Sequence, residues 1–207
     1  MIITDPAKIE ERSLEIISDE LGGRILMPEN AAVITRVIHC TADFDYADNL
    51  YFSEGAVVGA MDALKQGAAI VTDTNMAKAG INKSAADALG VKVNCFIADS
   101  DVAKDAKNRG CTRATVSMEK AAMLHPGCIV AVGNAPTALL ALSELIRTGK
   151  FSPSLIIGVP VGFVNILESK QAAMQSGVPC IVARGRKGGS NVAAAIVNAL
   201  MYQLYKR

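Results

Sequence analysis

Hydrophobic residues in this chain gather in short continuous runs, and these runs alternate with segments of helical periodicity. The runs predicted as strands are Ala68–Thr72, Val91–Ile97, Cys128–Val132, Leu155–Val159 and Cys180–Ala183. Most are apolar throughout instead of alternating with polar residues, which is typical of parallel strands covered on both faces. The pattern therefore predicts a sheet with no solvated face.

Amphipathic segments supply the helices. The predicted helices are Pro6–Asp19, Glu29–His39, Ser53–Gln66, Asp99–Arg109, Arg113–Met123, Pro136–Arg147, Ile166–Ser176 and Asn191–Tyr205. After the first two, helices and strands alternate, which indicates an α/β fold: a doubly wound, mainly parallel five-stranded sheet with helices on both faces. No segment reads as a linker, a repeat or low-complexity sequence, so residues 1–207 are predicted to form a single domain.

Composition limits the classes of partner. Hydrophobic residues make up 51% of the 207 residues and aromatic residues only 4%, so the core must be aliphatic. The 21 basic and 20 acidic residues leave a net charge near +1. That balance supplies no global field for nucleic acid or an anionic membrane, so any anion site must be local. We expect no nucleic-acid or membrane partner, and no apolar run is long enough to span a bilayer.

Five widely spaced cysteines include no Cys-x-x-Cys pair, so neither a disulfide framework nor a zinc site is indicated. We expect reduced thiols and a cytoplasmic protein. Asp73 and Asp99 follow predicted strands and suit metal or ribose binding, but carboxylates there are as often helix caps. No converging ligands accompany them, so no metal site is predicted.

Polar and glycine-rich segments follow four of the predicted strands. In an open parallel sheet, ligands bind beyond the carboxyl ends of the strands. The loop Gly185–Ser190 sets Arg186 and Lys187 among Gly185, Gly188 and Gly189 and leads into a helix, which favours anion binding over a flexible basic turn. The segment Gly133–Thr137 suits a helix start, while its glycine and Asn134 also suggest close backbone approach to a ligand. Standard nucleotide motifs are absent from both loops.

His39 is the best candidate for proton chemistry. It is one of two histidines and lies in the last turn of its predicted helix, three residues after Arg36. The two side chains share one helix face and can reach one ligand. On this segment alone, complementing the helix dipole is preferred to catalysis, because cationic residues are common at helix C-termini. The other histidine, His125, precedes a strand and is expected as a turn residue at the opposite edge.

Taken together, these segments resemble the precorrin-8 methylmutase family, most closely its cobalt-precorrin-8 branch. The matching stretches cover nearly the whole chain: Glu11-Arg12-Ser13, Arg36–His39 with Thr41–Asp45, Thr72–Thr74 with Gly80–Lys83, Thr112-Arg113, Gly133–Leu139, Gly158–Val164 with Glu168-Ser169-Lys170, and Gly185–Ala195. Each stretch is weak alone, but their joint order is specific. One departure is Ala114, where relatives often have serine, which puts one hydroxyl contact in doubt.

The resemblance implies an isomerase that moves a methyl group from carbon 11 to carbon 12 of a corrin precursor in cobalamin biosynthesis. It implies an α/β fold, a homodimer and no added cofactor, any cobalt belonging to the substrate. The histidine at His39 would be the proton donor, with Ser13, Arg36 and Arg113 contacting the substrate. The loops carrying Asn134, Thr137 and Arg186–Ser190 are expected to bind its periphery.

This chemistry agrees with the residues. A tetrapyrrole acid carries many carboxylates around a broad apolar disc, so it calls for several separate anion-binding loops, and arginine binds carboxylates through paired hydrogen bonds. A histidine can protonate the conjugated ring near neutral pH, since its ordinary pKa is about 6.5. Two rivals remain: a non-catalytic corrinoid carrier, and an α/β enzyme that uses the Arg186-Lys187 loop to bind a phosphate ligand.

Overall fold

The computed structural model describes residues 2–205, which form a six-stranded sheet in the order β1-β6-β5-β4-β2-β3. The strands are β1 (Leu50–Phe52), β2 (Ile70–Thr72), β3 (Val93–Asn94), β4 (Ile129–Val132), β5 (Leu155–Gly158) and β6 (Cys180–Ala183). The five predicted strands are all present and run parallel, so the predicted fold class is confirmed. The predicted strand count is wrong by one, because β1 adds an antiparallel edge strand beside β6. Three residues are too short a run for periodicity to reveal.

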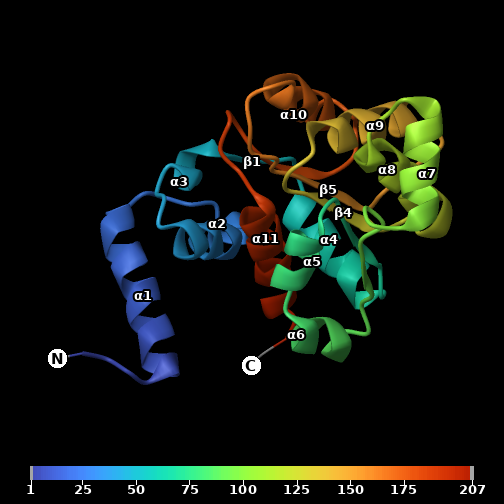
Figure 1. Ribbon diagram of the computed structural model, residues 1–207. Helices are drawn as coiled ribbons and strands as arrows, with labels where there is room; N and C mark the ends of the chain where they lie inside the picture. The colour runs from blue at the N-terminus through green and yellow to red at the C-terminus, as the bar shows by residue number, and fades with distance from the viewer. Residues whose placement is uncertain (1, 206–207) are drawn as a thin grey trace.

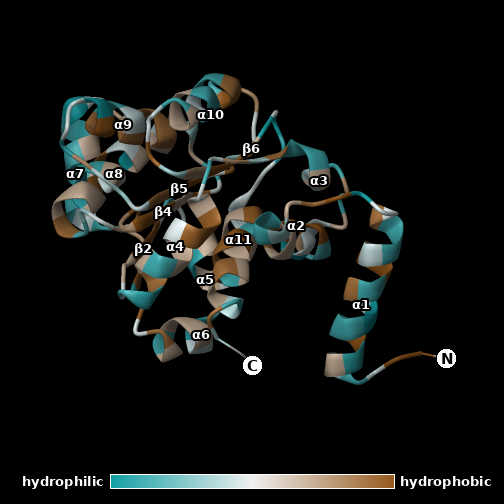
Figure 2. Ribbon diagram, turned by 180° about the vertical axis from the view of Figure 1, so that it is seen from behind, coloured by the Kyte–Doolittle hydropathy of each residue, from teal (hydrophilic) through white to brown (hydrophobic). Residues whose placement is uncertain are grey.

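Helices cover both faces of this sheet (Figure 1). They are α1 (Pro6–Leu21), α2 (Pro28–Thr41), α3 (Tyr46–Asn49), α4 (Ala56–Lys65), α5 (Asn75–Gly80), α6 (Lys83–Ala88), α7 (Ser100–Arg109), α8 (Arg113–Leu124), α9 (Pro136–Arg147), α10 (Ile166–Met174) and α11 (Ser190–Tyr202). The core on one face packs α2, α4, α5, α6 and α11 against the sheet, and that on the other packs α8, α9 and α10. Helix α1 stands apart at one side and contacts α2 (Figures 1 and 2).

Neighbouring residues in each central strand are buried in the hydrophobic cores on opposite faces of the sheet. Ile129 points into the α11 side and Val130 into the α9 side, and both are almost fully buried. Both neighbours are apolar because both faces of the strand are covered. The central strands β4 and β5 are accordingly brown, the hydrophobic end of the scale, in Figure 2. None of the helices within residues 2–205 is long and apolar enough to cross a membrane.

The strand order reverses between β2 and β4, and the loops that follow these strands meet there. From β2 the chain moves outward to β3, then returns to β4 and continues in the other direction to β5 and β6. Such a reversal opens a crevice at the carboxyl edge, where doubly wound proteins bind ligands. The loops after β2, β4 and β6 therefore form the first place to look for a site.

Gly133 is required by how closely these loops approach. A Cβ at this position would lie 2.6 Å from Cα of Ser190 and 2.7 Å from the carbonyl oxygen of Gly189. Both contacts are to backbone, so a methyl group there must displace the start of α11. Gly133 is thus a packing residue between the β4 and β6 loops.

We expect Gly133→Ala to lower the free energy of unfolding by about 1–3 kcal/mol, the usual cost of overpacking. Gly127→Ala is the matched control, because a Cβ at Gly127 meets nothing within 4 Å and its φ is not positive. Urea unfolding of both variants checks this. Equal midpoints for the two variants would contradict the assigned contact.

Candidate functional site

Helix α2 presents Arg36 and His39 on the face opposite its buried residues. Val37 and Ile38 are buried in the core, which fixes the rotation of the helix. One terminal nitrogen of Arg36 (Nη1) lies 3.4 Å from Nδ1 of His39. The helix ends at Thr41, after which Ala42 adopts a left-handed φ of 52° and turns the chain. The prediction that His39 lies in the last turn and shares a face with Arg36 is confirmed.

Arg36 is held on two further sides. Its Nη2 atom lies 3.0 Å from Oε1 of Glu10 on α1, and its guanidinium carbon lies 5.2 Å from the ring centre of Tyr202 on α11. Ser13 lies one helical turn after Glu10, and its hydroxyl donates to the carbonyl of Ile9 over 2.7 Å. Three predicted site residues, Ser13, Arg36 and His39, are thus brought to the junction of α1 and α2.

A pocket of about 290 Å³ opens beside His39. Its lining comes from α2, α5 and α11: Arg36, His39, Cys40, Gly80, Asn191, Ala194, Ala195, Asn198 and Tyr202. Ala194, Ala195 and Gly80 make part of the wall apolar, while polar groups come from Arg36 and His39 on α2 and from Asn191, Asn198 and Tyr202 on α11. This volume is at the lower end for ligand cavities, so it can receive one edge of a broad molecule.

A second group of predicted residues gathers at the start of α8 and α9. The Thr112 hydroxyl caps α8 and lies 3.0 Å from that of Thr137 on α9. Arg113 is the first residue of α8, and its side chain is exposed. Asn134 is also exposed, and its backbone N–H donates to Asp73. Arg113, Asn134 and Thr137 therefore lie around neighbouring helix starts.

The carboxylate of Asp73 fixes the backbone that carries Asn134 and leads into α9. Its side chain is 1% exposed, and its carboxylate accepts backbone N–H bonds of 2.7–2.9 Å from Gly133, Asn134 and Ala135. Burial raises the pKa of Asp73, and these three donors oppose that rise. Asp73 does not cap the helix that follows its strand, since Thr74 is the N-cap of α5; its carboxylate instead binds the loop that leads from β4 into α9.

The loop Gly185–Ser190 is anchored at both ends. The ammonium of Lys170 on α10 donates to the carbonyls of Gly185 and Lys187 over 2.8 and 2.9 Å. At the other end, the Ser190 hydroxyl lies 2.8 Å from that of Thr74 at the start of α5. Gly189 donates its N–H to Val159. These contacts fix the loop Gly185–Ser190 across the carboxyl edge of the sheet, and it is called the strap below.

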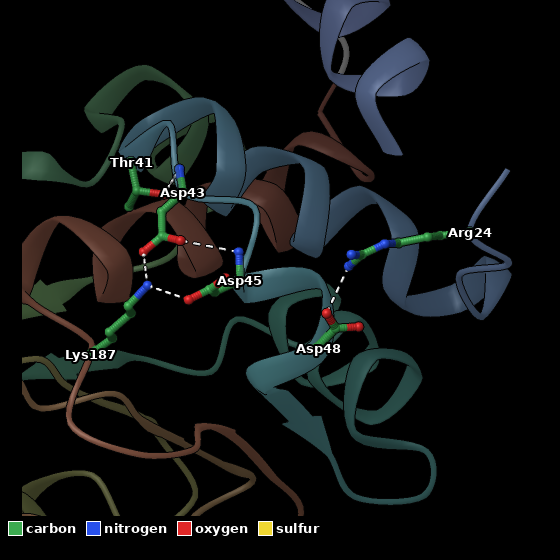
Figure 3. Close-up of polar contacts among 6 residues, drawn as sticks. All are labelled: Arg24, Thr41, Asp43, Asp45, Asp48 and Lys187. Carbon is green, nitrogen blue, oxygen red and sulfur yellow. Dashed lines mark hydrogen bonds and ion pairs between the residues drawn. The ribbon is translucent and has the colours of Figure 1, made fainter. Parts of the chain in front are cut away.

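Its two predicted cations differ in their surroundings. Arg186 is exposed, and its guanidinium carbon lies 5.7 Å from the ring centre of Phe163. The ammonium of Lys187 is 2.6 Å from a carboxylate oxygen of Asp43 and 2.6 Å from one of Asp45, as Figure 3 shows. The hydrogen bond from Lys187 lowers the pKa of Asp43, and the two carboxylates raise the pKa of Lys187.

Sequence reasoning missed several residues that shape this site. Glu10 and Tyr202 hold Arg36, yet no local pattern marks a helix residue as the partner of a distant arginine. Lys170 belonged to a family-like stretch, but its burial follows only from the packing of α10. Asp99, considered as a ligand, pairs with Lys120 instead. His125 lies before β4, with its Nε2 3.3 Å from Nδ2 of Asn94.

The chain is similar to known proteins over nearly its whole length. The sequence profile of the precorrin-8X methylmutase family matches residues 8–203. The cobalt-precorrin-8 methylmutase of Salmonella typhimurium is 45% identical, over 98% of this chain and 97% of that protein. The corresponding protein of Priestia megaterium is 41% identical, over 96% and 88%. The crystal structure of the precorrin-8X methylmutase from Thermus thermophilus superposes with a TM-score of 0.86 at 42% identity, covering 93% and 95%.

The buried amine of Lys170 generates a prediction about pH. Its side chain is 2% exposed, and burial lowers its pKa to about 8, whereas an unfolded lysine titrates near 10.5. Between these values the unfolded chain binds one more proton than the folded protein, so stability must rise with pH. The gain amounts to about 3 kcal/mol by pH 10.5.

Comparing wild type with Lys170→Met isolates this effect from other titrating groups. Denaturant unfolding from pH 7 to 10.5 should show the free energy of wild type rising relative to that of the variant. Parallel curves for the two proteins would mean that the Lys170 amine does not titrate in this range.

Proposed function

The chain belongs to the precorrin-8X methylmutase family, and from that premise we propose how its residues carry out the reaction. Family members named cobalt-precorrin-8 and precorrin-8X methylmutase match it over nearly their full lengths. The chain is therefore an isomerase of cobalamin biosynthesis that moves a methyl group from carbon 11 to carbon 12 of precorrin-8 or its cobalt form.

We propose that His39 is the proton donor. The observation that carries this role is its position: it lines the pocket between α2 and α11, with Nδ1 held 3.4 Å from Arg36. A proton, or a strong hydrogen bond, given to the conjugated ring draws electron density from the neighbouring carbon. That carbon then accepts the migrating methyl with its bonding pair more easily, the bond to the carbon left behind breaks, and the cationic ring returns the proton to His39. General acids of this kind contribute about 10²–10⁴-fold to rate.

The substrate carboxylates are proposed to contact both groups of predicted residues. Arg36 lies beside His39 and Ser13 belongs to the neighbouring helix α1, while Arg113 and Thr137 lie in the first turns of α8 and α9 and Asn134 just precedes α9. Arg186, Gly188, Gly189 and Ser190 belong to the strap between them. Arg113 and Arg186 are exposed, and neither lies within ion-pair distance of a carboxylate in residues 2–205. Both guanidinium groups are therefore available to an acidic ligand.

We further propose that the reaction uses no added cofactor, because the methyl shift is internal to the substrate and needs neither an oxidant nor a methyl donor. Any cobalt would enter as part of the substrate. The proposed place of action is the cytoplasm, which is supported by five cysteines that are all unpaired, two of them buried as small apolar residues.

A homodimer is proposed from the exposure of α1. Ile9 and Ile16 are 45% and 40% exposed and, being seven residues apart, share one face of this outlying helix. Exposed apolar faces of this kind mark protein interfaces. The same helix carries Glu10 and Ser13, so the proposed interface would lie close to the His39 pocket.

His39→Ala should lower turnover of cobalt-precorrin-8 by at least about 10²-fold while retaining affinity for cobyrinic acid. His125→Ala, at the opposite edge, is the control and should keep wild-type turnover. An anaerobic absorbance time course measures conversion, and NMR identifies the product because isomerisation leaves the mass unchanged.

Near-normal turnover by His39→Ala would show that His39 is not the proton donor. Binding without conversion by wild type would favour a corrinoid carrier instead. Stabilisation of the protein by phosphate ligands, but not by cobyrinic acid, would favour the phosphate-binding alternative.

The dimer is tested separately by sedimentation equilibrium. Wild type should have twice the 21.7 kDa chain mass, and Ile9→Glu/Ile16→Glu should sediment at the chain mass because two buried charges oppose association. A monomeric wild type would reject the dimer, and a dimeric variant would reject α1 as its surface.

A further inference from the structure

Lys187 connects two segments that are far apart in the sequence. Its ammonium donates to Asp43 and Asp45, which lie just after α2, while its backbone belongs to the strap that leads into α11 (Figure 3). Asp43 also accepts the backbone N–H of Asp45 at 3.0 Å, and its own N–H donates to the Thr41 hydroxyl at 3.3 Å. The carboxylates are thus fixed relative to the last residue of α2.

The backbone of Lys187 is fixed relative to the sheet. Its carbonyl accepts from the buried ammonium of Lys170. The next residue, Gly188, runs so close to the end of β5 that a Cβ there would meet Val159 backbone atoms. Because these contacts fix the main chain at Lys187, the ion pairs of its side chain also fix the position of Asp43 and Asp45.

Its partners, Asp43 and Asp45, lie just beyond the end of α2, the helix that carries His39. His39 and Cys40, in the last turn of α2, form one side of that pocket, and Asn191, in the first turn of α11, forms another. Lys187 precedes α11 by three residues, and Asp43 follows α2 by two. The ion pairs therefore connect the C-terminus of α2 to the segment entering α11.

The charges explain why this cluster is suited to positioning. Two carboxylates surround one ammonium, so the cluster carries a net negative charge and offers no free cation to a substrate carboxylate. Asp45 and Lys187 are also substantially exposed, at 66% and 46% of their side chains. Exposed ion pairs contribute little to global stability. Removing them should leave the fold intact and alter only local geometry.

We propose that Lys187 is a positioning residue for the methyl shift, which, through Asp43 and Asp45, holds the end of α2 so that the imidazole of His39 meets the ring. This inference rests on the proposed role of His39. It assigns Lys187 a different task from Arg186, whose guanidinium has no carboxylate partner within residues 2–205. Displacement of a catalytic group by about 1 Å can cost on the order of 10²-fold in rate.

Lys187→Met should therefore lower kcat by roughly 10–100-fold and change KM and cobyrinic acid affinity less than about twofold. Asp43→Asn/Asp45→Asn should give the same loss, and the triple variant should lose no more than either, because all three side chains act as one unit. Lys187→Arg should recover much of the activity, since its guanidinium can bond both carboxylates. Lys65→Met, which breaks the exposed pair with Asp62, is the control.

Thermal unfolding of each variant establishes that it is folded. An unchanged kcat in Lys187→Met would overturn the proposal. So would a raised KM in Lys187→Met combined with normal or tighter binding in Asp43→Asn/Asp45→Asn, because that result identifies Lys187 as a substrate ligand released from its carboxylates. Failure of wild type to convert cobalt-precorrin-8 would count against the methylmutase activity itself. That outcome is distinct from the loss of kcat in Lys187→Met, which tests the positioning role alone.

Discussion

The buried carboxylate of Asp73 is the interaction on which the carboxyl edge of the sheet depends. Three successive N–H groups after β4 point at it, so the start of α9 is fixed to the end of β2 at the place where the strand order reverses. Burial disfavours such a charge and raises the pKa of Asp73, and the three donors offset part of that cost. Because Gly133 is held there, the strap from β6 can pass within backbone contact of it.

A second buried charge, the ammonium of Lys170, holds the other side of the strap. A lysine with 2% exposure is unfavourable unless its donors are satisfied, and two carbonyls of the strap accept from it. Together Asp73 and Lys170 leave the loops of the carboxyl edge little freedom. Rigid loops suit a reaction in which a proton donor must meet one position of a large ring, because misplacement is costly.

Much of this arrangement was predictable from local pattern. The five parallel strands were found because buried strands are apolar throughout, and His39 was placed at its helix end by periodicity. The short helices α5 and α6 were missed, although Thr74 and Asn82 are N-caps whose side chains accept backbone N–H groups. The edge strand β1 pairs with β6, some 130 positions away, and no local signal specifies that partner.

The site itself was predictable only in part, for the same reason. Residue type showed which side chains can bind an anion, but it could not show which of them are already paired. Both Arg186 and Lys187 were expected to bind the substrate from their place in a glycine-rich loop. Asp43 and Asp45 were visible in the same family-like stretch as His39, yet their contact with Lys187 spans more than 140 residues.

The cationic side chains around the site are therefore of two kinds: some are paired with carboxylates of the protein, and others have no such partner within residues 2–205. Arg36 has Glu10 and Lys187 has two aspartates, so each is oriented by the protein before any substrate arrives. Arg113 and Arg186 lie on the exposed edge with no such partner within residues 2–205. With a net charge of only +1, the chain gains no long-range attraction for an acidic ligand. We infer that the unpaired arginines add short-range recognition to the contact proposed for Arg36, while Lys187 holds the helix end that carries the proposed proton donor.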